Sequence, residues 1–173
     1  MIGDGFMNFI SFLANFNQQD HSKITAVKTK FNQELNPLLL FPLFKQIGQD
    51  ITFYGPIDFS VGANISLADN IIVDLDVDFK DYASISIGKN TFIGPNVTFN
   101  TLIEDPKSNI ACAPIKIEND VKIGGHVTIQ AGVTIHEHAV IGAGSVVTSD
   151  VPAFSFFAGN PAKKISSSTR HSS

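Results

Sequence analysis

The sequence has a single cysteine and few basic residues. Cys112 is the only cysteine among 173 residues, which excludes an intrachain disulfide and fits a reducing, cytoplasmic compartment. Lysine and arginine total 12 against 16 aspartate and glutamate residues, and no basic run is longer than Lys163-Lys164. Because nucleic-acid binding needs a basic patch, we expect no nucleic-acid partner.

The N-terminus lacks basic residues before Lys23. The first sixteen residues, MIGDGFMNFISFLANF, are apolar, but they have no positively charged n-region and are too short to span a bilayer. We therefore expect neither a signal peptide nor membrane binding. Phe6, Phe9, Ile10, Leu13 and Phe16 recur at helical spacing, so this segment is expected to pack on the rest of the protein or on a neighbouring subunit.

Residues 1–50 are expected to form an N-terminal helical segment. Ser22 is the predicted N-cap of a helix, with Ile24, Val27, Phe31 and Leu35 on one face. Asn36 and Pro37 predict a second helix start, and Gly48 its end. Pro42 lies inside this second segment, so the helix is expected to be short or kinked.

The strongest pattern is an aliphatic residue at every sixth position. From residue 117 onward these residues are Ile117, Ile123, Ile129, Ile135, Ile141 and Val147. The fifth position of each unit is again small or aliphatic, at Val121, Val127, Val133, Ala139, Ser145 and Val151. The same register occurs earlier, as Val61/Ile65, Leu67/Ile71, Val73/Val77, Ile87/Thr91 and Ile93/Val97.

A period of six differs from the helical period of 3.6 and from the period of two expected for a sandwich of alternating strands. It is typical of a hexapeptide parallel β-helix, in which three units form a triangular coil and stacked coils lie about 4.8 Å apart. The fold class is therefore predicted to be mainly β. Glycine and asparagine pairs are expected at corner turns with positive φ, at Gly62 and Asn64, Gly88 and Asn90, and Gly94 and Asn96.

The β-helix is expected to cover residues 51–165, with two breaks in register. The first lies between Val77 and Ile87, where Asp78, Lys80 and Asp81 form a polar excursion. The second is a loop insertion at residues 100–114, which contains TLIEDPKSNIACAP. Loops on rigid scaffolds often carry function. Residues 166–173, SSSTRHSS, form a polar tail that is expected to be disordered.

Residues 115–165, IKIENDVKIGGHVTIQAGVTIHEHAVIGAGSVVTSDVPAFSFFAGNPAKKI, resemble the hexapeptide-repeat acyltransferases, with the maltose and galactoside O-acetyltransferases as the nearest branch. VIGAGSVVTSDVP followed by AGNPA carries most of this resemblance, and Tyr54-Gly55 and the repeat at 61–77 extend it. The resemblance implies a left-handed β-helix, a homotrimer, and transfer of an acetyl group from acetyl-CoA to a sugar hydroxyl. Left-handedness rests on the resemblance alone, since general chirality rules favour right-handed crossovers.

The resemblance also implies a set of acetyl-CoA contacts in a groove between adjacent subunits. Gly125, Ala143 and Thr148 match residues that contact the cofactor through backbone or small side chains, and Lys163 matches a basic residue near its phosphates. Ser149 stands where the family usually has a second lysine, so phosphate attraction is weaker. The alternative is that the small residues serve the turns and Lys163 is an ordinary surface charge.

The catalytic base of the family is absent at its usual place. The family uses a loop histidine after a stretch like Pro95-Asn96-Val97-Thr98-Phe99, and that position falls on Glu104, followed by Asp105 and Pro106. A general base contributes about 10²- to 10⁴-fold to such a transfer. Glu104 could serve only if burial raised its pKa, and otherwise it belongs to a solvated acidic turn.

The acceptor residues of the family are also changed. Its asparagine aligns with Ala68, with Asn70 nearby, and its aspartate aligns with Asp76 or Asp81; a tryptophan is replaced by Lys122. Asn70 and Asp76 are the predicted acceptor contacts. His126, His136 and His138 lack the spacing of a zinc site, so no metal is expected.

Two functions follow from these changes. The first is an acetyl-CoA-dependent O-acetyltransferase for a sugar or similar small hydroxyl acceptor, with Glu104 in place of the histidine or with His21 or His126 acting across a subunit interface. The second is a catalytically degenerate family member that binds CoA or a partner without acetyl transfer. A purely structural trimer would bind no CoA.

Overall fold

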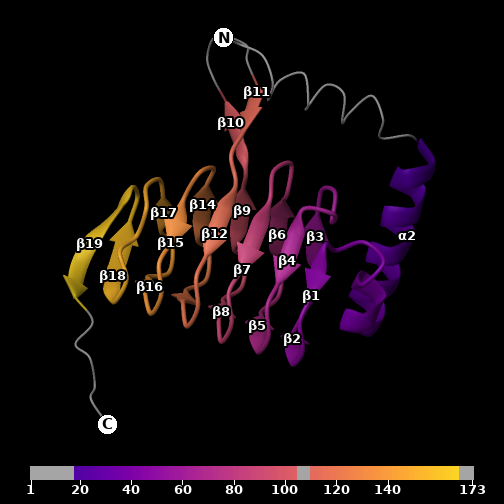
Figure 1. Ribbon diagram of the computed structural model, residues 1–173, viewed down its shortest axis with the longest axis horizontal. Coiled ribbons are helices and arrows are strands. Elements are labelled where there is room, and N and C mark those ends of the chain that lie inside the picture. The colour runs from indigo at the N-terminus through magenta and orange to yellow at the C-terminus, as the bar shows by residue number, and fades with distance from the viewer. Residues whose placement is uncertain (1–17, 105–109, 168–173) are drawn as a thin grey trace.

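The computed structural model describes residues 18–104 and 110–167. The predictions for the first sixteen residues and for residues 168–173 of the tail lie outside this range. The chain winds into stacked triangular coils with three faces, and each face is a sheet of parallel strands. Figure 1 shows these coils side by side, with helix α2 at the N-terminal end and strands β18 and β19 at the C-terminal end.

Each face is one sheet of parallel strands from successive coils. Face A contains β1 (Gln46–Ile47), β4 (Ile65–Leu67), β7 (Ile85–Ile87), β12 (Ile115–Ile117) and β15 (Thr134–Ile135). Face B contains β2 (Ile51–Phe53), β5 (Ile71–Val73), β8 (Phe92–Ile93), β13 (Lys122–Ile123), β16 (Val140–Ile141), β18 (Ser155–Gly159) and the antiparallel β19 (Ala162–Ser167). Face C contains β3 (Ile57–Phe59), β6 (Val77–Lys80), β9 (Thr98–Asn100), β14 (Thr128–Gln130) and β17 (Val146–Val147).

The six-residue pattern marks the interior of this β-helix. The lead and fifth-position residues that define the repeat from Val61 to Val151 are all buried, with exposed fractions between 0% and 6%. Face C adds an aromatic column, because Phe59, Phe79 and Phe99 are paired in register and point inward. The rings of Phe79 and Phe99 stack with centroids 5.0 Å apart. The expected parallel β-helix is therefore confirmed.

The chain turns from face A to B at corner AB, from B to C at corner BC, and from C to A at corner CA. Both predicted breaks lie at corner CA. Ile65 pairs with Ile85, 20 residues on, whereas Ile85 pairs with Ile115, 30 residues on. The long turn contains the antiparallel hairpin β10 (Leu102–Glu104) and β11 (Ile110–Cys112). Lys116 then pairs with Thr134, 18 residues on, as three strict hexapeptides require.

The corner turns differ from the prediction in which residues adopt positive φ. Asn90 and Asn96 do so, at 56° and 57°, but Gly88 and Gly94 do not. Glycine is required at position 94 because a Cβ there would lie 2.7 Å from the backbone nitrogen of Gly125 in the next coil. Gly62 has φ of 84°, as expected, and Asn64 does not have positive φ.

Helix α2 (Gln18–Glu34) covers the open N-terminal end of the β-helix. Ile24 and Phe31 are buried, and the Phe31 ring contacts that of Phe53 edge-on at 4.9 Å. Ser22 lies inside α2, so its prediction as the N-cap is wrong. The second helix is only a 3₁₀ turn, η1 (Pro37–Leu40), capped by the Asn36 side chain as predicted.

Gly48 does not end a helix, because strand β1 precedes it. A Cβ at Gly48 would lie 2.5 Å from the backbone carbon of Ala68, so glycine is needed there for close stacking of the coils. Strand pairing thus begins at Gln46, before the expected boundary at residue 51. Within the described ranges, no helix is long and apolar enough to cross a membrane.

Candidate functional site

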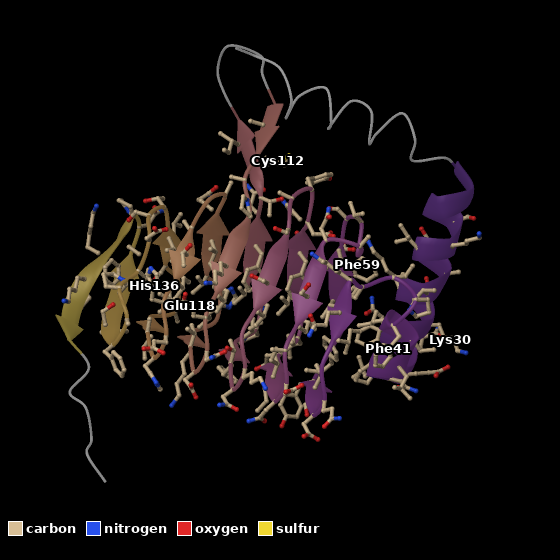
Figure 2. All side chains as sticks on the ribbon, viewed as in Figure 1. Lys30, Phe41, Phe59, Cys112, Glu118 and His136 are labelled. Atoms are coloured by element: carbon tan, nitrogen blue, oxygen red, sulfur yellow. The ribbon has the colours of Figure 1, made fainter. Side chains whose placement is uncertain are left out.

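The hairpin β10–β11 projects from corner CA and carries the candidate base (Figure 1). Glu104 ends β10, opposite Ile110 in register. Only the backbone of Glu104 belongs to the part of the chain that the structure describes, and Asp105 and Pro106 lie outside it. Cys112 lies on β11, where burial raises the pKa of its thiol (Figure 2).

Two of the predicted cofactor residues share corner CA with this hairpin. Thr148 and Ser149 follow strand β17 and are exposed. The next residue, Asp150, fixes the turn, because its carboxylate accepts a hydrogen bond of 2.7 Å from the backbone N–H of Thr134. Corner CA thus presents exposed hydroxyl side chains on a turn that is tied to face A.

Gly125 and Ala143 lie at corner BC, on the other edge of face C. Their turns stack, since the N–H of Gly144 donates to the Gly125 carbonyl at 2.9 Å. A Cβ at Gly124 would lie 2.7 Å from the nitrogen of Ala143, so close stacking of these turns requires glycine at position 124. Asp76 occupies the same corner in an earlier coil, with φ of 58°. Corner BC therefore combines closely stacked turns in the later coils with the carboxylates of Asp74 and Asp76 in an earlier coil.

The other two predicted contacts lie elsewhere. Asn70 is at corner AB, where its amide donates to Asn90 at 2.8 Å and Asn90 donates to Asp120 at 3.0 Å. This ladder links successive coils and is separated from Asp76 by strand β5. Lys163 is exposed on β19, opposite Ala158 of β18. Within one chain, Asn70 and Asp76 therefore do not meet.

Histidine side chains occupy corners of the later coils. His126 and His138 adopt positive φ at corners BC and AB, where asparagine or aspartate stands in earlier coils. The His136 Nδ1 lies 3.1 Å from the Glu118 Oε2 (Figure 2). Hydrogen bonds from Lys116 and then His136 lower the pKa of Glu118. The described residues contain no group of three or more potential ligands that could hold a metal ion.

A hollow lies between the base of the hairpin and face C. Its volume is about 480 Å³, and it is lined by Asn100, Leu102, Ile103, Gln130 and Ala131. Asn100 and Gln130 are adjacent in register on β9 and β14. The hollow thus adjoins corner CA, where Thr148 and Ser149 also lie.

Comparison with known proteins identifies the family. Residues 114–149 match the family model "Bacterial transferase hexapeptide (six repeats)". Galactoside O-acetyltransferase of Escherichia coli K12 is 36% identical over 133 residues, which cover 73% of this chain and 66% of that protein, just under two thirds. A hexapeptide-repeat acetyltransferase of Vibrio cholerae O1 biovar eltor, solved with acetyl-CoA, superposes with a TM-score of 0.82 at 32% identity, covering 88% of both chains. This chain belongs to the hexapeptide-repeat acetyltransferases.

A maltose O-acetyltransferase of Clostridium difficile 630 supports the same assignment. It superposes with a TM-score of 0.80 at 32% identity, covering 87% of this chain and 89% of that one. The predicted resemblance is thus confirmed, and so is the left-handed β-helix. Handedness could not be derived from the six-residue period, because that period is the same for either hand.

Sequence reasoning missed two features of this family member. The first is the Asn100–Gln130 pair. These two residues occupy equivalent outward positions on β9 and β14, so aligning the repeats on either side of the loop insertion would have paired them. The second is the Glu118–His136 pair. Glu118 and His136 each follow a lead isoleucine, a position that is glycine at 88, 94, 124 and 142. Charged or polar residues in place of this glycine were a signal that the sequence offered.

Proposed function

We propose that this protein is an acetyl-CoA-dependent O-acetyltransferase that acts on a hydroxyl group of a sugar or similar small acceptor. The observation that carries the proposal is the match, over 88% of the chain, to an acetyltransferase solved with acetyl-CoA. The galactoside and maltose enzymes among the relatives favour a sugar-like acceptor. The single cysteine fits a cytoplasmic location.

The distribution of the predicted cofactor residues favours a site between two copies. Gly125 and Ala143 lie at corner BC, and Thr148 and Ser149 lie at corner CA, on opposite edges of face C. In a closed trimer with face C turned toward the three-fold axis, corner BC of one subunit meets corner CA of the next. One side of the proposed groove is formed by the small residues Gly125 and Ala143, which leave room for the pantetheine arm, and the other side by the hydroxyl groups of Thr148 and Ser149. Lys163 offsets the charge of the CoA phosphates.

The proposed reaction is a direct acyl transfer. The acceptor hydroxyl gives its proton to a base as its oxygen bonds to the acetyl carbonyl carbon. The carbon–sulfur bond then breaks, and the base returns the proton to the sulfur so that CoA leaves as a thiol. Glu104 is the proposed base, at the place of the family histidine. Asp76 at corner BC is the proposed acceptor contact, whereas Asn70, at corner AB opposite face C, would lie outside this groove. Backbone N–H groups of the corner turns would stabilise the oxyanion.

A thiol-release assay tests the proposed function. The protein is incubated with acetyl-CoA and a panel of neutral sugars that includes maltose and methyl galactoside, and free CoA is measured with a thiol reagent. Acceptor-dependent release of CoA together with an acetyl ester in mass spectrometry is the expected result. CoA binding without release from any acceptor would contradict transfer.

That outcome would support the second candidate, a family member that binds CoA or a partner without transferring acetyl groups. The loop sequence at residues 101–114 favours this candidate, because it contains no histidine. Isothermal calorimetry with CoA separates it from a purely structural trimer, for which no heat of binding is expected.

A further inference from the structure

The outward side of face C carries a column of amide side chains next to the hairpin. Gln130 pairs in register with Asn100, which pairs in turn with Lys80. The intervening Phe99 and Ile129 are fully buried, so the flanking residues face outward. Continuing the register of Thr128 with Val146 and of Ile129 with Val147 places Thr148 next to Gln130 in the following coil. Adjacent residues of such a column lie about 4.8 Å apart.

The amide of Asn100 has a fixed orientation. Its Oδ1 accepts a hydrogen bond of 3.2 Å from the backbone N–H of Leu102, at the start of the hairpin. Since a carboxamide carries two N–H donors as well as its oxygen, Asn100 keeps donors for a ligand. Gln130, which lines the same hollow of about 480 Å³, offers both donors and an acceptor.

The walls of the hollow suit a neutral molecule. Its five lining residues are two amides, Leu102, Ile103 and Ala131, and none of them is charged. Lys80, the next residue of the column, is paired with Asp78 at 3.8 Å. The Ile103 side chain is 42% exposed and gives the hollow an apolar wall. Amides opposite an apolar wall match a sugar, whose ring has hydroxyl edges and C–H faces.

We propose that Asn100 and Gln130 bind the acceptor, and that they select a neutral, hydroxyl-rich molecule over a charged one. This inference rests on the proposed function, because it assigns the acceptor half of that site. The register places Gln130 one coil and Asn100 two coils from Thr148, a proposed acetyl-CoA contact, so that an acceptor held by both amides would lie near the cofactor. The two residues would act in recognition, with no part in proton transfer.

The test uses Asn100→Asp and Gln130→Glu. Both substitutions keep the size of the side chain, and Asn100→Asp also keeps an acceptor for the Leu102 N–H. Each substitution removes the N–H donors of the amide and adds a negative charge. Losing such a hydrogen bond should raise the KM for maltose or methyl galactoside about fivefold or more. The kcat and the KM for acetyl-CoA should remain within about twofold, since recognition alone is affected. Gln46→Glu, the same change on outward face A, is the matched control and should leave all three constants unchanged.

A binding measurement separates this inference from the proposed function. Maltose and methyl galactoside are titrated into each protein in the presence of CoA, and NMR shifts are followed. Binding to the wild type that is lost in both variants, with glucuronic acid bound more weakly than glucose, supports the amide site even if no acetyl transfer occurs. Equal binding and equal acceptor KM in the wild type and both variants would overturn it. Failure of the wild type to bind any neutral sugar would also overturn it.

Discussion

The buried carboxylate of Asp81 accepts a hydrogen bond of 2.7 Å from the backbone N–H of Gly62. It also accepts bonds from the N–H groups of Val61 at 2.8 Å and Ser60 at 2.9 Å. In addition, the backbone carbonyl of Asp81 accepts a 2.7 Å bond from the Asn64 amide. One residue thus satisfies a whole turn of corner CA in the preceding coil. The polar excursion expected at this break is therefore a structural element of the β-helix.

Asp81→Asn should destabilise the protein at neutral pH. The Asn side chain keeps one oxygen, but its NH₂ group would face at least one of the three backbone N–H donors. A buried donor without an acceptor costs about 1–3 kcal/mol. Chemical unfolding of the two proteins measures the difference in free energy. A control, Asp74→Asn, changes a half-buried corner carboxylate that accepts a hydrogen bond of 2.8 Å from the N–H of Leu75 and should cost much less. Equal losses for the two variants would contradict the role given to Asp81.

The same residue predicts a pH dependence of stability. Burial raises the pKa of Asp81 above its usual value of 3.8, against the opposing effect of the backbone N–H donors. The folded protein therefore holds this proton more tightly than the unfolded chain does. Its contribution to stability is full below pH 3.8 and falls as the pH rises through the raised pKa. The stability difference between the wild type and Asp81→Asn should thus be larger at the acidic end of a titration and smaller at neutral pH. A difference that grows with rising pH would contradict this sign.

Two glycines should respond differently to the same substitutions. A Cβ at Gly94 would lie 2.7 Å from the Gly125 nitrogen. A Cβ at Gly144 would meet nothing within 4 Å, so only the positive φ of 72° restricts which residue can stand there. Gly94→Ala should cost about 1–3 kcal/mol because the coils cannot separate locally. Gly144→Asn should cost less than about 1 kcal/mol, since asparagine tolerates this conformation, as Asn96 does in an earlier coil. Thermal unfolding of Gly94→Asn, which should be at least as damaging as Gly94→Ala, completes the comparison. Recovery of stability by asparagine at position 94 would show that φ is the constraint there.

The residues inside the β-helix could be predicted from the sequence, and those around the site only in part. Ile123 and Ile141 must stack because a six-residue period returns each lead side chain to the same inward position. Asp81 could not be assigned in the same way, since its bonds to the turn at Gly62 depend on the length of an irregular corner. The roles of Gly94 and Gly48 depend on the distance between coils, which glycine content alone does not reveal. Handedness and the proposed meeting of corners BC and CA between subunits likewise require more than the repeat.

Glu104→Gln tests the proposed base. The amide cannot take a proton from the acceptor, so kcat should fall by about 10-fold or more, while the Kd for acetyl-CoA should change little. Steady-state thiol release and calorimetry measure the two quantities. Glu137→Gln changes an exposed residue of corner AB and is the matched control. An active wild type whose kcat is indifferent to Glu104→Gln would exclude Glu104 as the base and direct attention to His126 across the interface.

Lys163 and Lys164 form a matched pair on strand β19. They face Ala158 and Phe157 of β18, respectively, and adjacent strand residues point to opposite sides. If Lys163 approaches the phosphates of CoA, Lys163→Ala should weaken CoA binding about two- to fivefold, and the effect should shrink at high salt. Lys164→Ala should have little effect. Equal losses in the two variants, measured by calorimetry at low and high salt, would indicate a general charge effect in place of a specific contact.

A crystal structure of the protein with CoA tests the central claim most directly, because that claim is a cofactor groove across the two edges of face C. The account predicts a trimer in which the pantetheine arm contacts Gly125 and Ala143 of one subunit and Thr148 of the next, with the sulfur beside Asn100 and Gln130. CoA bound within a single subunit, on face A or on face B, would contradict it.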